Sequence, residues 1–242
     1  MLLPAPLTPP TLVEDALRER GFAVLDAAGL AAFSGVAEGG FADLSPLWDD
    51  LPADAYLRDG GRYRRRRHAC LVVEGGRHRT VPHRAHWQPV EYNALHGGLE
   101  RWFEPVSLQM LEAPAFLHLI HALARCASRL KGEQPWYVEV HQFRIDTTDG
   151  IGRPTPEGAH RDGVDLVAVV LVARSGIKGG ETRVFEAHGS HGIRFTLTEP
   201  WSALLLDDER VIHESTPIQP LDGPGHRDTL VVTLRARGFQ GP

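Results

Sequence analysis

His160 and Asp162 lie two residues apart in the segment His160-Arg161-Asp162-Gly163, and a further histidine, His213, lies downstream of strand-like sequence. On an extended strand, residues i and i+2 point to the same side, so the first two side chains can be directed at one point. Two neutral imidazoles and one carboxylate on one side of a metal ion leave its other side open. That arrangement is typical of non-haem Fe(II) oxygenases.

A His-x-Asp pair also arises by chance, and this chain has 13 histidines. Alone, such a pair is more often a surface or hydrogen-bonded pair than a metal site. Arg227 favours the metal interpretation, because it precedes the apolar run 230–232 and so begins a strand that reads as buried. A buried guanidinium needs an anionic partner, and the distal carboxylate of 2-oxoglutarate would be one. Arg235 and Arg237 are the competitors for this role.

A resemblance to a known family is carried by 154–163 (PTPEGAHRDG), 93–105 (NALHGGLERWFEP), 179–182 (GGET), His213, Arg227 and Asp228. In these motifs the chain resembles the bacterial 2-oxoglutarate/Fe(II) dioxygenase family that includes L-isoleucine 4-hydroxylase. The resemblance covers most of the chain, about residues 63–234. It implies a mainly β fold with flanking helices around a double-stranded β-helix core of the jelly-roll or cupin-like kind.

The resemblance also implies Fe(II), 2-oxoglutarate and O₂, with ascorbate as the expected reductant. The implied reaction is hydroxylation of an aliphatic C–H of a free L-amino acid, with release of succinate and CO₂; isoleucine-like substrates follow by analogy. Carried over by position, His160, Asp162 and His213 are the expected iron ligands, and Arg227 is the expected partner of the 2-oxoglutarate carboxylate. Related iron halogenases lack the carboxylate ligand, so the presence of Asp162 favours hydroxylation.

Two alternatives stay open at this point. The same chemistry could act on a peptide-, protein- or carrier-bound residue, although the chain shows no evident docking module. A non-catalytic metal-binding barrel could sense or store a ligand, although an open-sided ligand set together with Arg227 disfavours it. We therefore predict a 2-oxoglutarate-dependent non-haem iron dioxygenase that is an amino-acid hydroxylase with a small-molecule substrate.

The run 136–145 alternates between two faces if it is a strand. Tyr137, Glu139 and His141 share one face, which indicates either the wall of a polar cavity or a solvent-facing surface. The ammonium of an amino acid needs an acceptor such as Glu139, and its carboxylate needs a donor such as an arginine. The candidate substrate-binding residues are Tyr137, Glu139, His141, Arg144 and Glu157.

An arginine-rich run precedes this strand and contains Arg62, Arg64, Arg65, Arg66 and Arg67. It could be a phosphate-binding patch or a strand whose guanidiniums pair with nearby acids. Because the net charge is −5 and no aromatic stripe interleaves the arginines, we expect no nucleic-acid partner. One or two of these arginines could face the cavity and hold a substrate carboxylate. Three histidines that follow do not have metal-motif spacing and are expected at the surface or the cavity rim: His78, His83 and His86.

With 242 residues, 42% hydrophobic and 24% charged, the chain is typical of one globular domain over residues 1–242, with a proline-rich tail at 1–10. Cys70 and Cys126 are too few for a disulfide framework and are expected to be reduced thiols. The N-terminus has no basic region and no long apolar stretch, so we expect no signal peptide, no membrane span and a cytoplasmic location. The oligomeric state stays open.

The helix and strand signals predict an all-β core with helices packed outside. Residues 11–14 match a capping box for a helix to about Arg20, 27–41 is weakly helical, and 114–130 has the apolar spacing of a supporting helix. The predicted strands are 22–25, 62–73, 136–145, 164–173, 182–185, 193–197, 202–206, 211–213 and 229–235.

Overall fold

The computed structural model describes residues 3–93 and 95–242. Its largest element is a seven-stranded sheet in the order β1-β9-β5-β12-β4-β2-β3, in which all neighbours are antiparallel. The strands of this sheet are β1 (Phe22–Leu25), β2 (Arg64–Glu74), β3 (Arg77–Thr80), β4 (Trp136–Asp146), β5 (Leu166–Ser175), β9 (Ala203–Asp207) and β12 (His226–Arg235). The long central strands β4, β5 and β12 carry most of the residues that matter for the site.

Shorter strands form a second layer, as a three-stranded sheet β10-β7-β8 and a two-stranded ribbon β11-β6. They are β6 (Ile177–Gly179), β7 (Thr182–Glu186), β8 (Gly192–Phe195), β10 (Val211–Ser215) and β11 (Ile218–Pro220). Val184 and Phe195 of this layer pack in one core with Val167 and Leu171 of β5. Two antiparallel sheets that face each other make a double-stranded β-helix, so the predicted mainly β fold is confirmed.

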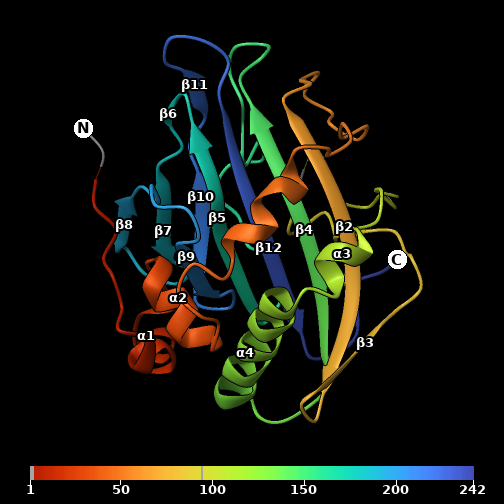
Figure 1. The fold of residues 1–242 in the computed structure, drawn as a ribbon, viewed down its shortest axis with the longest axis vertical. Coiled ribbons are helices and arrows are strands. Elements are labelled where there is room, and N and C mark those ends of the chain that lie inside the picture. The colour runs from red at the N-terminus through yellow and green to blue at the C-terminus, as the bar shows by residue number, and fades with distance from the viewer. Residues whose placement is uncertain (1–2, 94) are drawn as a thin grey trace.

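The helices lie on the other face of the large sheet, in front of it in Figure 1. They are η1 (Pro10–Leu12), α1 (Val13–Arg20), α2 (Ala27–Ser34), η2 (Ala42–Trp48), α3 (Leu108–Leu111) and α4 (Pro114–Lys131). Phe116 and Leu119 of α4 pack in the main core with Val138 and Val140 of β4. Because side chains alternate along a strand, the residues between them, such as Glu139, point away from the helices and towards the second layer.

Helix α4 agrees with the predicted helix at 114–130, with proline in its first turn and Gly132 directly after its end. The predicted capping box at Thr11 is wrong. Residues 10–12 form a 3₁₀ turn, α1 starts at Val13, and the residue before it, Leu12, has no side-chain cap. The 3₁₀ turn therefore leads directly into α1, and the Thr11 side chain does not cap the helix.

The second predicted helix is shorter than expected, because α2 ends at Ser34 and not near residue 39. Gly35 adopts a φ of 73°, in the left-handed region, and its N–H bonds back to the carbonyl of Ala31. A glycine in this conformation is a common helix stop. The helix stop is therefore Gly35, which lies within the predicted range 27–41.

Both cysteines, Cys70 and Cys126, are buried free thiols. Burial raises the pKa of Cys126 to about 12 and also raises that of Cys70, so both are protonated and unreactive at neutral pH. In the described residues, no helix has the length and apolar character needed to cross a bilayer.

Two leucines, one buried and one exposed, test the packing of the helices. Leu119 on α4 is 1% exposed, whereas Leu108 on α3 is 68% exposed. Leu119→Ala leaves a cavity in the core and is expected to lower the free energy of unfolding by about 2–5 kcal/mol. Leu108→Ala makes the same chemical change at the surface, where a change within about 0.5 kcal/mol is expected. Urea unfolding followed by circular dichroism measures both, and equal effects would contradict the core described here.

Candidate active site

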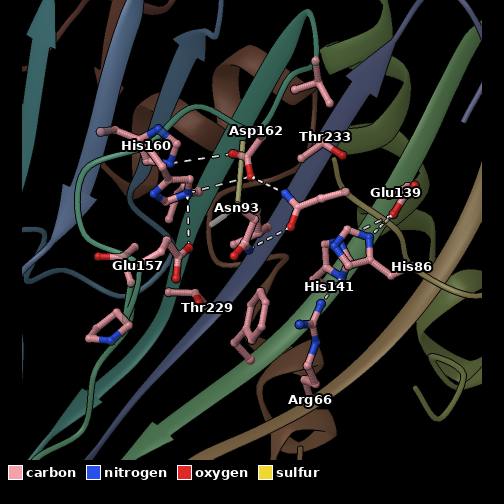
Figure 2. A pocket seen from close by; sticks show the side chains of 18 of the residues that line it. Arg66, His86, Asn93, Glu139, His141, Glu157, His160, Asp162, Thr229 and Thr233 are labelled. Carbon is pink, nitrogen blue, oxygen red and sulfur yellow. Dashed lines mark hydrogen bonds and ion pairs between the residues drawn. The ribbon is translucent and has the colours of Figure 1, made fainter. Parts of the chain in front are cut away.

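The three predicted metal ligands lie together in the cavity between the two sheets. His160 and His213 form an isolated antiparallel bridge in which each backbone N–H donates to the other's carbonyl at 3.0 Å. Asp162 Oδ1 lies 3.8 Å from His160 Nε2, and Asp162 Oδ2 lies 3.8 Å from His213 Nε2. One ligand atom of each residue lies within 4.8 Å of the others. Figure 2 shows His160 and Asp162 side by side in the cavity.

The hydrogen bond of His160 and the neutral state of His213 suit metal binding. Nδ1 of His160 donates to the carbonyl of Gly158 at 2.9 Å, so the lone pair is on Nε2, which faces Asp162. Burial opposes protonation of His160, but Asp162 and Glu157 together raise its pKa. Burial holds the pKa of His213 well below its ordinary value, so this imidazole is neutral, as a ligand must be. A cation such as Fe(II) therefore fits this donor set of two nitrogens and one carboxylate.

Asp208, directly after β9, binds the backbone of the segment 160–164, which carries His160 and Asp162 and which we call the ligand loop. Its side chain accepts the backbone N–H groups of Asp162, Gly163 and Val164 at 3.0, 2.8 and 3.1 Å. Gly163 has a φ of 75°, and a Cβ there would clash with the ring of Tyr92, so glycine is required at this turn. Burial and the nearby Asp162 raise the pKa of Asp208 to about 7, although the three N–H donors act in the opposite direction.

Gln88 orients the carboxylate of Asp162 from the side. Its Nε2 donates to Asp162 Oδ1 at 3.2 Å, while its Oε1 accepts from Asn93 Nδ2 at 3.1 Å and from Arg101 Nη2 at 3.0 Å. Such outer partners fix the direction of a metal ligand. The sequence offered no local signal for Gln88 or Asp208, because each reaches the ligand loop from a distant segment.

Arg227 lies on β12, is 4% exposed and lines the same cavity as the triad. Burial and the neighbouring Arg174, its register partner on β5, lower its pKa to about 10. Within the described part of the chain no carboxylate pairs with Arg227, and the adjacent Asp228 is bound instead by Arg144 at 2.7 and 2.8 Å. A guanidinium buried without a counter-ion needs an anion from a ligand.

Of the predicted substrate-binding residues, Tyr137, Glu139, His141 and Glu157 line this cavity. Arg144 does not, and its assignment is wrong. It occupies the even-numbered face of β4, the helix side of the sheet, where it binds Asp228 and also Asp49 at 3.3 Å. The two-residue period of the strand sends its side chain away from the cavity.

Glu139 is held by two histidines. His68 Nε2 lies 3.0 Å and His86 Nδ1 lies 2.6 Å from Glu139 Oε2. Burial lowers the pKa of His86 to about 4 and also lowers that of His68, while the histidines outweigh burial and lower the pKa of Glu139. Two neutral imidazoles thus donate N–H groups to an ionised carboxylate. Of the two expected places for His86, the surface is wrong, since the residue is 8% exposed, and His86 lines the cavity instead.

His141 completes this cluster, which we call the histidine wall (His68, His86, Glu139 and His141). Its ring stacks on His68 with centroids 4.7 Å apart, and its Nδ1 lies 2.8 Å from Arg66 Nη2. Figure 2 shows His86, Glu139 and His141 at the end of the cavity away from His160. The cavity therefore has two polar ends, the triad at one and the histidine wall with Arg66 at the other.

A double-stranded β-helix that encloses two histidines and one carboxylate with an open side defines the class of non-haem metal oxygenases. A model of the 2OG-Fe dioxygenase family matches residues 45–233, and the chain belongs to that family. The resemblance predicted from the motifs is thereby confirmed, and the family implies Fe(II) and 2-oxoglutarate.

Solved structures agree with this assignment. A bsmA homolog from Methylobium petroleophilum PM1 is 52% identical, with a TM-score of 0.93, and the match covers 99% of this chain and 98% of that one. IDO from Bacillus thuringiensis is 16% identical, with a TM-score of 0.76 over 94% and 99%. The Fe(II)/α-ketoglutarate-dependent dioxygenase TqaL is 18% identical, with a TM-score of 0.70 over 93% and 86%. The last two show the fold alone. No protein with a curated description matches the sequence.

Asp208→Asn tests whether this carboxylate holds the ligand loop. An amide keeps the shape but turns an NH₂ group towards a backbone N–H, so the loop that carries Asp162 loses one acceptor. The dissociation constant for Fe(II), measured by anaerobic calorimetry, is expected to rise roughly 10- to 100-fold. Asp207→Asn is the matched control, because Asp207 pairs with Lys131 away from the triad. Equal metal affinity in the two variants would refute this role of Asp208.

Proposed function

We propose that this 2OG-Fe dioxygenase hydroxylates an aliphatic C–H of a free L-amino acid. In this proposal His160, Asp162 and His213 bind Fe(II), and Arg227 binds the distal carboxylate of 2-oxoglutarate. The observation that carries the proposal is the convergence of the three ligand atoms within 4.8 Å in a cavity that also contains the buried Arg227, which no carboxylate of the described residues pairs with.

When bound, Fe(II) and 2-oxoglutarate would supply an oxidant made from O₂, with succinate and CO₂ as the other products. The protein's own residues hold the parts in place. Gly158 directs Nε2 of His160 inwards, Asp208 fixes the loop, and Gln88 holds one oxygen of Asp162. A substrate held in this enclosed site would present one C–H to the metal and exclude water from it.

An amino acid suits the charged groups that remain free in the cavity. Glu157 has a buried oxygen, Oε2, with no partner among the described residues, and a substrate ammonium would satisfy it. Glu139, the acceptor suggested by the sequence, already receives two imidazole N–H groups, so Glu157 is the better candidate. Tyr137 lies at the cavity edge against Phe239, with ring centroids 5.1 Å apart, and would border the substrate.

The isoleucine-like character of the substrate rests on analogy. The structural neighbour IDO is an isoleucine dioxygenase, and its similarity supports a branched aliphatic amino acid as the first compound to test. Thr229, Val169 and Val231 line the same cavity and would contact an aliphatic side chain.

The proposed activity can be tested directly with Asp162→Ala. Purified protein is incubated with Fe(II), ascorbate, 2-oxoglutarate and O₂, and succinate is measured with each free L-amino acid in turn. One amino acid is expected to raise succinate well above the uncoupled background and to gain one oxygen in mass. Asp162→Ala is expected to lose this coupled release, because the metal loses its carboxylate ligand.

Asp49→Ala is the matched control for that variant, because the Asp49 side chain is 76% exposed, and it is expected to keep full activity. Full activity in Asp162→Ala would refute the ligand assignment. If no amino acid stimulates turnover while 2-oxoglutarate is still consumed slowly, the substrate is larger or carrier-bound.

Arg227→Ala is expected to raise the KM for 2-oxoglutarate roughly 10- to 100-fold, the range for a lost charge-assisted hydrogen bond, with unchanged iron content. Arg235→Ala is the control, since Arg235 lies on the same strand and lines the same cavity but donates to the carbonyl of Gly238. Steady-state kinetics with varied 2-oxoglutarate measures both. A larger rise for Arg235→Ala would transfer the role to that residue.

A further inference from the structure

Three buried arginines line the cavity near the histidine wall. Arg64, Arg66 and Arg101 are 6%, 4% and 2% exposed, and all three line the cavity. We call them the arginine pole. Arg64 and Arg66 come from β2 and Arg101 from the connection before α3, so the fold brings them together from separate segments.

Asp54 is the acid that serves two members of this pole. Arg64 Nε donates to Asp54 Oδ2 at 2.7 Å, and Arg66 Nη1 lies 3.8 Å from the same oxygen. Arg66 is further held between the rings of Phe103 and Phe143, with its guanidinium carbon 3.8 and 4.4 Å from their centroids. The two rings hold the Arg66 guanidinium in place and shield it from water. Because less water screens its charge, its interactions with other charged groups are stronger.

Among the residues that the structure describes, no acid forms an ion pair with Arg101. Its hydrogen bond in the described structure goes to the neutral Oε1 of Gln88, and its buried Nε has no partner among the described residues. Nη2 of Arg64 and Nε of Arg66 are likewise buried without a partner there. Burial and the neighbouring Arg64 lower the pKa of Arg101 to about 10.

The carboxylates near Arg101 do not pair with it. Asp54, Glu157 and Glu139 all favour its charged form, but none of them forms an ion pair with it among the described residues. Buried guanidinium N–H groups without a partner are costly, and Arg64, Arg66 and Arg101 each have one here. This part of the cavity is therefore suited to an anionic group.

We propose that Arg101, with Arg66 beside it, binds the α-carboxylate of the substrate. This inference rests on the proposed function and names the residues that recognise its substrate. Gln88 joins Arg101 to Asp162 through hydrogen bonds of 3.0 and 3.2 Å, so the carboxylate end of the substrate would lie one side chain away from the metal ligands. The 2-oxoglutarate carboxylate has its own partner in Arg227, on a different strand.

The histidine wall could itself be considered as a second metal site, since its four residues offer ligand atoms within 4.8 Å of one another. Its hydrogen bonds argue against that use. His68 and His86 donate N–H groups to Glu139, and the lone pair of His141 Nδ1 accepts from Arg66 at 2.8 Å. The adjacent guanidiniums would also repel a cation. The histidine wall instead lines the part of the cavity in which we place the substrate carboxylate.

The test uses anaerobic protein loaded with Fe(II) and 2-oxoglutarate, titrated by calorimetry with each proteinogenic L-amino acid and with its carboxamide. The amino acid that binds best is expected to bind at least about 10-fold more tightly than its carboxamide, because the amide lacks the charge. Arg101→Gln is expected to weaken binding of that amino acid roughly 10- to 100-fold, with little change for the carboxamide and none for 2-oxoglutarate. Arg101→Lys is expected to restore part of the affinity.

Arg62→Gln is the control and is expected to bind like the wild type, because the Arg62 side chain is 84% exposed, pairs with Asp149 at 3.1 Å and does not line the cavity. Equal binding of acid and carboxamide by the wild-type protein, or binding of no amino acid, would overturn the proposal even if Arg101→Gln failed to fold. Equal behaviour of Arg101→Gln and Arg62→Gln would overturn it as well. Slow 2-oxoglutarate consumption without any amino acid, measured in parallel, reports on the iron and co-substrate site alone, so its absence marks a failure of the proposed function instead.

Discussion

The two-residue alternation of the long central strands is the constraint on which this site depends. On β4, Val138 and Val140 join the core beneath the helices, while Glu139 and His141 face the cavity. The same alternation on β12 sends Leu230 and Val232 to the core and Val231 and Thr233 to the cavity. A one-residue slip in register would exchange the two sets, so the apolar packing of the helices also determines which polar groups surround the ligand.

Burying so many charged groups is tolerable only because most of them are paired in defined geometry. Asp208 receives three backbone N–H groups, Asp54 serves Arg64 and Arg66, and Glu139 receives two imidazole N–H groups. Among the described charged residues that line the cavity, unpartnered buried atoms remain on Arg64, Arg66, Arg101 and Glu157. Groups left unpaired in an otherwise satisfied interior indicate where ligands complete the structure.

The convergence of the candidate metal ligands could be predicted in part from the sequence, because His160 and Asp162 are close in the chain and local spacing determines their common direction. The central strands were also predictable, since their alternation and apolar content are local properties. Arg144 was placed wrongly because a candidate donor was chosen by residue type, although its even position on the strand already assigned it to the face of Val138 and Val140. The alternation of side chains along β4 would have placed Arg144 correctly.

The residues that sequence reasoning missed share a different property. Gln88, Arg101 and Asp208 act on groups 13 to 74 positions away, so no periodicity or short motif marks them. His86 was expected at the surface or the cavity rim because its spacing matched no metal motif, yet it is a hydrogen-bond donor to the buried carboxylate of Glu139. Only the pairing of β2 with β4, which sets His68 opposite His141, could have revealed the wall.

Gln88 connects the two ends of the cavity, since one amide group contacts both Asp162 and Arg101. The amide of Asn93 holds it from a third direction, so Gln88 has little freedom to turn. The position of Arg101 relative to Asp162 is therefore held by a side chain of the protein itself and not by the ligands that bind. A site whose spacing is fixed in advance can select a substrate by the separation between its charged end and the carbon to be oxidised.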